Sequence, residues 1–349
     1  MKPLFFCLLL LAWSIANAEE PSSGGKVAPV FAADEIVDVT IEAPIAEIMK
    51  TRSLEEETQG TFTYRDAEAG EEVELDIGIR TRGRFRHNSK TCPFAPLRLN
   101  FRKTKGTLLA KSDKMKLVTH CRTGSKRYEQ ALLKEYVAYR ILNTMTDWSF
   151  RVRLLRIRYV ESDGSEDPID TYGILIEHRE QLAKRIGMEL DESESTTVAA
   201  LDGAHTNVVS LFQFLIGNTD FSPIKGVPGE RCCHNHELLK NDDTQISVPY
   251  DFDISGIVSP PHARPNPRFN LKDVRERLYR GRCANNGQLE TTLAMYRDRS
   301  DEIYGLIGDL EPMSKSEKTK TTRYVEDFYK VIDTPRLLQR DIVKDCLGP

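Results

Sequence analysis

Residues 214–256 have the sequence FLIGNTDFSPIKGVPGERCCHNHELLKNDDTQISVPYDFDISG, which concentrates side chains that bind metals and carry protons. Asp220 follows directly after an apolar helical pattern, and Asp251 follows a short apolar strand pattern. Carboxylates at the ends of buried elements are held rigidly while they face solvent, where hard cations such as Mg²⁺ find oxygen ligands. The segment therefore predicts a metal site between a helix and a strand.

Two more oxygen donors lie in the same segment. Asn235 stands between the two aspartates and offers a neutral amide oxygen. Asp253, two residues after Asp251, shares its face of an extended segment and could add another ligand. An aspartate left free of the metal could accept a hydroxyl proton. The order helix, Asp, Asn, strand, Asp is the order in which protein kinases place their base and two metal ligands.

The residues before this segment predict a β-rich region with one long helix. In residues 71–83 apolar and polar side chains alternate, as in a half-buried strand. Residues 128–145 contain neither Gly nor Pro and carry apolar side chains at helical spacing. Further strand patterns occupy residues 96–101, 114–120, 151–160 and 171–180.

The residues around and after the segment predict mainly helix. A helical pattern covers residues 206–217, after an acidic surface loop at residues 188–205. Residues 260–270 are rich in proline, which makes a helix there improbable. From about residue 271 to the C-terminus the patterns are helical again.

Several motifs together resemble the CotH kinase-like family, atypical secretory-pathway kinases first described among spore-coat proteins. The motifs are RGRFRHNSK, KMKLVTHC, IGNTD, HN and PYDFDISG, and the resemblance runs from the first strands to Arg282. It implies an α+β chain with an atypical protein-kinase-like two-lobe fold. The β-rich N-lobe would cover residues 34–180, and a mainly helical C-lobe would cover residues 181–349 and hold the catalytic and metal segment.

The resemblance also implies a function, transfer of a phosphoryl group from Mg²⁺-ATP to protein hydroxyls. Matched by motif position, Asp220 is the catalytic-loop aspartate and Asn235 the catalytic-loop asparagine. Asp251 is the metal-binding aspartate of a DFG-like segment. Asp253 stands where that motif has glycine, and it is a possible further ligand. The gap between Asp220 and Asn235 is much longer than the four residues of the ordinary kinase motif.

A kinase also needs a phosphate-binding lysine on the strand before its first helix, paired with a glutamate of that helix. Lys116 precedes the helix that carries Glu129 and Glu135. We therefore expect Lys116 to pair with Glu135. Lys114 and Arg98 are the alternatives for the phosphate-binding cation.

Residues 80–86 offer a second set of phosphate contacts. No Gly-rich motif precedes the expected lysine, and Gly83 is the single glycine of RTRGRFR. Four arginines alternate along this stretch, Arg80, Arg82, Arg84 and Arg86. They would share one face if the strand continued, and guanidinium groups could take the place of glycine amides at phosphate. The alternative is a solvated edge strand that carries charges against aggregation.

The N-terminus has the features of a secretory signal peptide at residues 1–18. A cation at Lys2 precedes a short apolar run, and Ala16 and Ala18 form a small-residue cleavage pattern. The run is too short to cross a bilayer, and no other segment is long and apolar enough. We expect a chain that is exported to the periplasm or outside the cell, with no integral membrane segment after cleavage. Residues 19–33, rich in Pro, Gly and Ser, predict a flexible leader.

The cysteines beyond the signal peptide form an even set, which predicts disulfides in an oxidising compartment. Sequence alone does not give their pairing. The adjacent Cys232 and Cys233 are not expected to bond to each other, so each should reach a distant partner. The others are Cys92, Cys121, Cys283 and Cys346.

The charge balance and the CCHNH motif bear on the choice of partners. With 49 Lys and Arg against 53 Asp and Glu, the chain offers no overall attraction to nucleic acid. A non-catalytic kinase-like binding or surface protein is one alternative, because a Gram-negative periplasm holds little ATP. A zinc-dependent hydrolase built on residues 232–236 is another, although their spacing does not match structural zinc sites. His234 either positions the catalytic loop or satisfies a core hydrogen bond.

Overall fold

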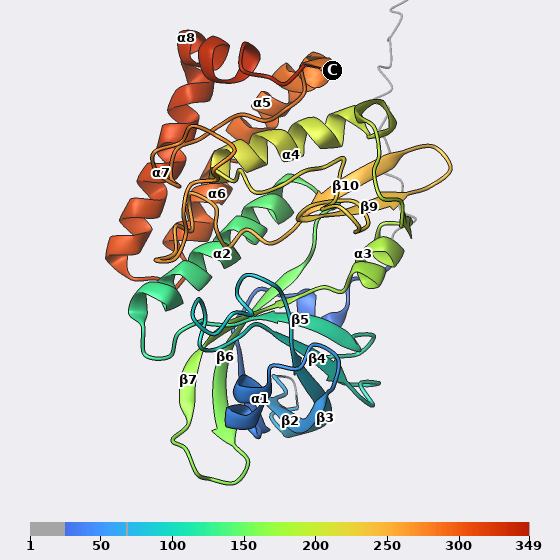
Figure 1. Ribbon diagram of the computed structural model, residues 1–349, viewed down its shortest axis with the longest axis vertical. Coiled ribbons are helices and arrows are strands. Elements are labelled where there is room, and N and C mark those ends of the chain that lie inside the picture. The colour runs from blue at the N-terminus through green and yellow to red at the C-terminus, as the bar shows by residue number, and fades with distance from the viewer. Residues whose placement is uncertain (1–24, 68, 349) are drawn as a thin grey trace, which may run out of the picture.

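Seven strands form a closed mixed barrel in the N-terminal half of the chain (Figure 1). The structure is a computed structural model that describes residues 25–67 and 69–348, so the predicted signal peptide lies outside the described residues. β1 pairs with β6 in parallel and closes the barrel, while the other neighbours are antiparallel. The strands are β1 (Val37–Ala43), β2 (Thr58–Arg65), β3 (Glu72–Thr81), β4 (Leu97–Phe101), β5 (Lys114–Val118), β6 (Val152–Glu161) and β7 (Ile169–Ile176).

The two-residue period of the strands explains why the C-terminal end of β7, residues 174–176, is apolar on both faces. Leu175 points into the barrel core, while Ile174 and Ile176 belong to a second core outside it. That second core includes the buried face of the long helix α2 (Lys126–Met145). A strand buried on both faces reads as a continuous apolar run, because each face needs apolar side chains.

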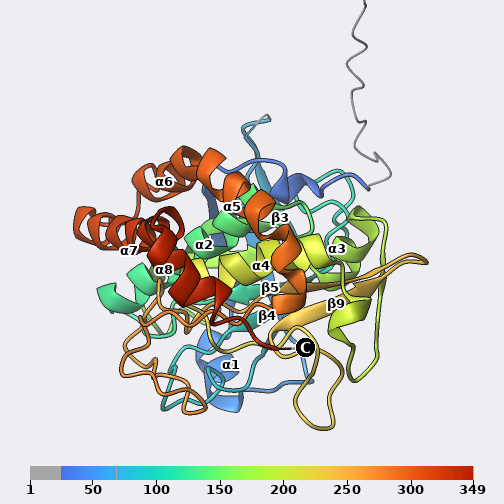
Figure 2. The ribbon, with the colours of Figure 1, turned by 90° about the horizontal axis from the view of Figure 1, so that it is seen from above.

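Apart from α1, which contacts β3 and β6, the helices lie on one side of the barrel, and the long helix α2 packs directly against β6 and β7 (Figures 1 and 2). α2 contacts β7, α4 and α6, and a small sheet of order β10-β9-β8 flanks α4. No helix within the described residues is long and apolar enough to cross a membrane. The remaining elements are α1 (Ile45–Thr51), α3 (Arg179–Arg185), β8 (Glu189–Leu190), α4 (Gly203–Ile216), β9 (His236–Lys240), β10 (Gln245–Pro249), α5 (Leu289–Asp298), α6 (Ser300–Gly308), α7 (Lys315–Asp333) and α8 (Pro335–Leu338).

The structure confirms the α+β class, with a β-rich part followed by a mainly helical one. The proline-rich residues 260–270 contain no helix, as the sequence predicts. The prediction of a flexible leader over residues 19–33 is wrong for residues 29–31. Residues 29–31 form a 3₁₀ turn in which Val30 and Phe31 are buried against the barrel core. Two apolar side chains gain enough by burial to fix this short segment.

Three disulfides join the cysteines of the described residues. Cys92 bonds to Cys121 and Cys283 to Cys346. Cys232 and Cys233 bond to each other across a cis peptide bond, so the expectation of distant partners is wrong. The other four cysteines beyond the signal peptide are already paired, which leaves these neighbours facing only each other.

Two glycines, Gly217 and Gly256, allow the segments before Asp220 and after Asp253 to approach helix α7. Gly217 ends α4 with a left-handed backbone, φ 64°, and its carbonyl accepts a hydrogen bond from the Gly256 N–H at 3.0 Å. A Cβ added at either glycine would collide with the Tyr324 hydroxyl. That hydroxyl donates to the Arg275 carbonyl, which fixes its position. Gly217 therefore positions the segment that leads to Asp220, and Gly256 positions the segment that follows Asp253.

Replacement of Gly256 by alanine should lower the free energy of unfolding by about 1–3 kcal/mol, because the new methyl group overpacks against Tyr324. Urea denaturation measures the change. Gly308→Ala is the matched control, because a Cβ there meets nothing within 4 Å, and it should stay within about 0.5 kcal/mol or gain stability. Equal stability of Gly256→Ala and Gly308→Ala would contradict the packing described here.

Candidate functional site

The β9–β10 hairpin brings Asn235 and Asp251 to the same end of the small sheet. His236 pairs with Pro249, so the next residues outward, Asn235 and Tyr250, lie opposite each other. The Tyr250 N–H donates to the Asn235 carbonyl at 2.9 Å. Asn235 and Asp251 both have left-handed backbones, with φ of 55° and 63°. Asn and Asp adopt this conformation more readily than most residues, and such conformations are enriched at functional sites.

Asp220 lies against this end of the hairpin. The Asn235 side-chain amide donates to the Asp220 carboxylate Oδ2 at 3.1 Å and to its carbonyl at 2.6 Å. His234 Nε2 is 3.0 Å from Oδ1 of the same carboxylate. Burial alone would raise the pKa of Asp220, but the hydrogen bond and charge of His234 and the Asn235 amide outweigh it and lower the pKa. Asp220 is therefore ionised and held in place from two sides.

Asp251 joins this end of the hairpin to the long helix α2. Its backbone N–H donates to the Tyr139 hydroxyl at 2.8 Å. Its carboxylate has no hydrogen-bond or ion-pair partner in the described part of the chain. Two residues later, the Asp253 carboxylate is 3.5 Å from the Arg86 guanidinium. The predicted ligand Asn235 thus contacts Asp220, and Asp251 and Asp253 follow the same hairpin.

Arg86 is the cation around which the buried acids gather. Its Nη1 lies 3.4 Å from Glu135 and 3.5 Å from Asp253, and its Nη2 donates to the Thr119 carbonyl at 2.8 Å. The Glu135 side chain is only 2% exposed. Burial, with Asp253 and Asp251 nearby, raises the pKa of Glu135 to about 8 despite Arg86. Burial, with Asp251 and Asp220 nearby, raises the pKa of Asp253 to about 7. The site therefore holds more carboxylates than neighbouring cations can neutralise.

The expected pairing of Lys116 with Glu135 is wrong, because Glu135 pairs with Arg86. The Lys116 ammonium lies 4.0 Å from the centroid of the Tyr250 ring, on the hairpin side of the site. Burial and the nearby Arg82 lower its pKa to about 8, while Glu237 and Asp251 oppose the shift. The Lys116 ammonium thus lies against Tyr250 of the hairpin and not against Glu135.

The cations proposed as alternatives to Lys116 lie on the same sheet. Arg98 is the cross-strand neighbour of Lys116 on β4, and Arg80 is the neighbour of Arg98 on β3. This register places three cations in one row across β3, β4 and β5. Lys114 is exposed and lies opposite Asn100.

The arginines of residues 80–86 do not share one strand face, because β3 ends at Thr81 and the chain turns into a loop. Arg82 is close enough to Asp251 for that carboxylate to oppose the lowering of its pKa by burial. Arg84 forms an ion pair with Glu230 instead. Gly83 has φ of 86° at an exposed turn where a Cβ would touch nothing, so a left-handed backbone explains the glycine. Arg82 and Arg86 thus reach the site from a loop.

The oxygen donors fit a hard cation by their chemistry. Asp251, Asp253 and the Asn235 amide are the kinds of ligand that Mg²⁺ takes, and the Asp251 carboxylate has no hydrogen-bond or ion-pair partner among the described residues. Burial, with Asp251 and Asp220 nearby, raises the pKa of Asp253, so a bound cation would favour its ionised form. Asp220, Asp251 and Asp253 interact electrostatically, but their carboxylates do not all lie within 4.8 Å of one another.

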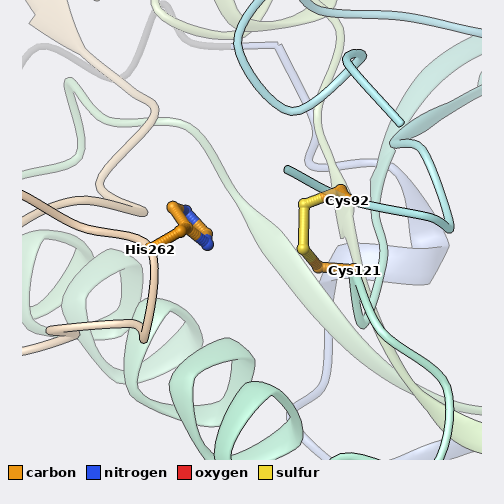
Figure 3. A group of neighbouring side chains, drawn as sticks. All are labelled: Cys92, Cys121 and His262. Carbon is orange, nitrogen blue, oxygen red and sulfur yellow. A yellow bond between two sulfur atoms is a disulfide. The ribbon is translucent and has the colours of Figure 1, made fainter. Parts of the chain in front are cut away.

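Within residues 25–67 and 69–348, one group of three potential ligands does lie within 4.8 Å (Figure 3). It consists of Cys92, Cys121 and His262. The two sulfurs are bonded to each other, so they are not free to bind a metal as thiolates. A cavity of about 20 Å³ adjoins Arg86, Cys121 and His262, and it has room for one water molecule.

The residues of the CCHNH motif are all engaged by other groups. Cys232 and Cys233 form a disulfide, and His234 contacts Asp220. The ring nitrogens of His236 lie 3.0 Å from the Ser247 hydroxyl and 3.3 Å from the Gln213 amide. These contacts give the zinc-dependent alternative no support.

The sequence did not predict that Arg86 pairs with Glu135 and Asp253, and it left the partner of His234 open. Arg86 belongs to the RGRFRHNSK motif, which marked it as a candidate phosphate contact. Its partners depend on the course of the loop after β3, which the sequence does not show. His234 directly precedes Asn235, and its contact with Asp220 depends on how the start of the hairpin packs against the chain after α4. The chain matches no family model, and no curated protein is significantly similar to it.

The raised pKa values set the sign of a pH dependence. In the unfolded chain Glu135 and Asp253 titrate near 4.5 and 3.8, so between pH 6.5 and 8 these two acids bind more protons in the folded protein than in the unfolded one. The lowered pKa of Lys116, about 8, opposes this effect only toward the upper end of the window. The free energy of unfolding must then fall as pH rises through this window. Buried or half-buried histidines with a pKa lowered to about 3–4 affect stability at lower pH: His120, His205, His236 and His262.

Glu135→Gln should make this decline shallower, by up to about 1.4 kcal/mol per pH unit, because one titrating proton is removed. Urea denaturation at several values between pH 6.5 and 8 measures the slope. Glu129→Gln, a partly exposed position on the same helix, should follow the wild-type slope. If Glu135→Gln also follows it, Glu135 is not protonated in the folded protein.

Proposed function

We propose that this protein is an atypical kinase of the CotH kinase-like type that transfers a phosphoryl group from a Mg²⁺-bound nucleoside triphosphate, ATP in the first instance, to a protein hydroxyl. The observation that carries the proposal is the contact of Asn235 with Asp220 at the end of the hairpin that also presents Asp251. Kinases use a base, an amide ligand and a carboxylate ligand in this chain order. The kinase-like two-lobe fold is part of the same proposal, with the barrel and α2 as the first lobe.

Each residue has a role that follows from its surroundings. The partner-free Asp251 carboxylate and the Asn235 oxygen would hold the metal, with Asp253 as a further ligand. A bound Mg²⁺ would neutralise charge on the β- and γ-phosphates. Lys116, half-buried beside Asp251, would contact the phosphates from the barrel side. Asp220 would orient the acceptor hydroxyl next to the γ-phosphate.

The cationic row on the barrel supports a polyanionic ligand. Arg80, Arg98 and Lys116 are cross-strand neighbours, and burial lowers the pKa of Arg98 and of Lys116. Desolvated cations of one sign repel one another, so the row costs stability unless an anion binds. A triphosphate fits this requirement.

A non-catalytic kinase-like protein is the second candidate, and Arg86 is the observation that favours it. Its guanidinium contacts both Asp253 and Glu135, so a metal ion that recruits Asp253 competes with this ion pair. A chain in which Arg86 permanently replaces the metal would keep the fold and lose transfer.

We also propose that the protein works outside the cytoplasm. Three disulfides among the described residues suit an oxidising compartment. The acceptor would then be another exported protein. The slightly acidic chain gives no reason to expect a nucleic acid as partner.

Asp251→Asn should abolish nucleotide binding that depends on Mg²⁺. In the wild type, ATP at about 100 times its Kd should add about 2.7 kcal/mol and raise Tm by about 5 °C, only with Mg²⁺ present. Thermal unfolding with ATP, Mg²⁺ or both measures this. Asp242→Asn, an exposed position in the same hairpin, is the matched control and should keep the shift. A shift retained in Asp251→Asn would remove Asp251 from the metal site.

Lys116→Met should weaken ATP binding by about 10- to 100-fold, the value of a charge-assisted contact. Without nucleotide the variant should be as stable as the wild type or more so, because a desolvated charge is removed. Isothermal titration with Mg²⁺-ATP and urea denaturation give the two quantities. Lys114→Met, on the same strand but exposed, should bind within about threefold of the wild type. The reverse ranking would assign the phosphate contact to Lys114.

A further inference from the structure

Residues 260–282, which follow the hairpin and its two aspartates, are strongly basic. They carry seven Lys and Arg against two acids, although the whole chain has a formal net charge of −4. The segment leads into a 3₁₀ helix at Cys283–Gln288, and the Cys283–Cys346 disulfide joins its end to the C-terminal residues. The positive charge of this segment is thus held in a fixed part of the fold.

Arg280 attaches the basic segment to the chain on both sides of Asp220. Its Nη1 donates to the Thr219 carbonyl at 3.0 Å and to the Phe221 carbonyl at 2.7 Å. Its guanidinium carbon lies 4.5 Å from the centroid of the Phe221 ring and 4.9 Å from that of Phe269. The backbone of Asp220 therefore runs between two carbonyls that are bound to one guanidinium group.

A tight turn places Arg268 beside the same stretch of chain. The Phe269 N–H donates to the Asn266 carbonyl at 3.1 Å and closes the turn. The Asn266 side-chain amide donates to the Thr219 carbonyl at 3.3 Å, and its oxygen accepts from the Arg268 N–H at 3.1 Å. Arg268 itself is exposed. The turn thus presents a solvated guanidinium group next to Asp220.

Arg268 and Arg280 have no ion-pair partner among the described residues. Burial and the charges of Arg282 and Arg268 lower the pKa of Arg280 to about 10, and Asp220 is the acid that opposes this shift. Three cations thus act on one another beside a single carboxylate. An anion brought by a ligand would relieve their repulsion.

The two acids of the basic segment do not balance these cations. The Asp273 carboxylate accepts from the Arg275 N–H at 2.8 Å, and the Glu276 carboxylate accepts from the Lys272 N–H at 3.1 Å. Both carboxylates thus lie on the backbone of their own loop. Neither is among the charges that act on Arg280.

We propose that Arg268, Arg280 and Arg282 form a basic surface that binds an acidic peptide segment, and that this segment carries the acceptor hydroxyl. The inference rests on the proposed kinase function and names the class of its acceptor. If Asp220 orients the hydroxyl, the residues on either side of that hydroxyl pass over the basic surface. The acidic balance of the whole chain argues against a nucleic acid in this place.

The free donors of the basic surface suit carboxylate side chains. Arg280 binds backbone carbonyls through Nη1 alone, which leaves its other N–H groups for a ligand. Arg282 likewise uses Nη1 for the Gly348 carbonyl, at 3.0 Å. Guanidinium groups form charge-assisted and often bidentate hydrogen bonds with carboxylates. Aspartate and glutamate near the acceptor hydroxyl would therefore pair with these groups.

The transfer itself balances with a nucleoside triphosphate as donor. The acceptor oxygen forms a bond to the γ-phosphorus, and its proton passes to solvent. The bond from the γ-phosphorus to the bridging oxygen breaks, and the nucleoside diphosphate leaves with that electron pair. The acidic residues of the acceptor take no part in these bonds, so their effect is on binding and orientation.

Two synthetic peptides of equal length test the proposal on the full chain. Each contains one serine, which is flanked by Asp and Glu in the first peptide and by Asn and Gln in the second. Fluorescence anisotropy of the labelled peptides measures binding without nucleotide, and label transferred from γ-labelled ATP with Mg²⁺ measures kcat/KM. We expect the acidic peptide to exceed the neutral one by about 10-fold or more in both, and added salt to reduce the difference.

Arg268→Glu tests the basic surface itself. Because Arg268 is exposed, its replacement should not disturb the fold, which thermal unfolding checks. The preference for the acidic over the neutral peptide should fall by about fivefold or more, and Arg268→Lys should keep most of it. Arg336→Glu, at an exposed position of α8, makes the same change of net charge and should keep the wild-type preference. An unchanged preference in Arg268→Glu would overturn the proposal.

The outcomes distinguish this inference from the proposed function. Equal binding of both peptides with equal transfer to them would overturn the acidic acceptor and leave the kinase proposal standing. A preference for the acidic peptide in binding with no transfer to either would keep the basic surface and overturn the proposed function. Absence of binding to either peptide would overturn this inference whatever the result with ATP. A single-stranded oligonucleotide that binds more tightly than the acidic peptide, and does so through Arg268, would assign the surface to nucleic acid and also overturn it.

Discussion

The register of the β9–β10 hairpin is the constraint on which the candidate site depends. Because His236 pairs with Pro249, Asn235 and Asp251 emerge at the same end of the sheet. A shift by one residue would move each side chain to the opposite face, so the register is as important as the residue types. The Ser222–His234 bridge then ties this end to the chain that carries Asp220.

Electrostatics in the site work against stability. Glu135 and Asp253 share Arg86, and burial raises the pKa of both acids. On β5 of the barrel, burial lowers the pKa of Lys116. Groups of both signs are thus held in unfavourable surroundings without complete pairing. Shifts of this kind cluster where a protein binds ions or moves protons, because a ligand can supply the missing charge.

The rigid parts of the fold lie directly behind these groups. Asp251 is anchored to Tyr139 of α2, and the loop that carries Arg86 is joined at Cys92 to Cys121, just before α2. Tyr324 of α7 fills the space left by Gly217 and Gly256. The segments that carry Asp251 and Arg86 are therefore tied to α2 or to the chain just before it, which holds these charged side chains close together.

The sequence by itself determined the α+β class and the strands and helices with clear periodicity, and it singled out Asp220, Asn235 and Asp251 as candidate site residues. These features depend on local spacing and on residue chemistry, which a single chain displays directly. Helix α2 and strand β7 are examples, since their burial dictates their patterns.

The tertiary structure decided which partner each group has. The choice of Arg86 over Lys116 as the partner of Glu135 follows from the end of β3 at Thr81, after which the chain turns toward α2. The Cys232–Cys233 bond and the contact of His234 with Asp220 also depend on how distant segments meet. The periodicity of a sequence does not predict contacts between distant segments, because these contacts are set by the packing of the barrel against the helices and by the hairpin register.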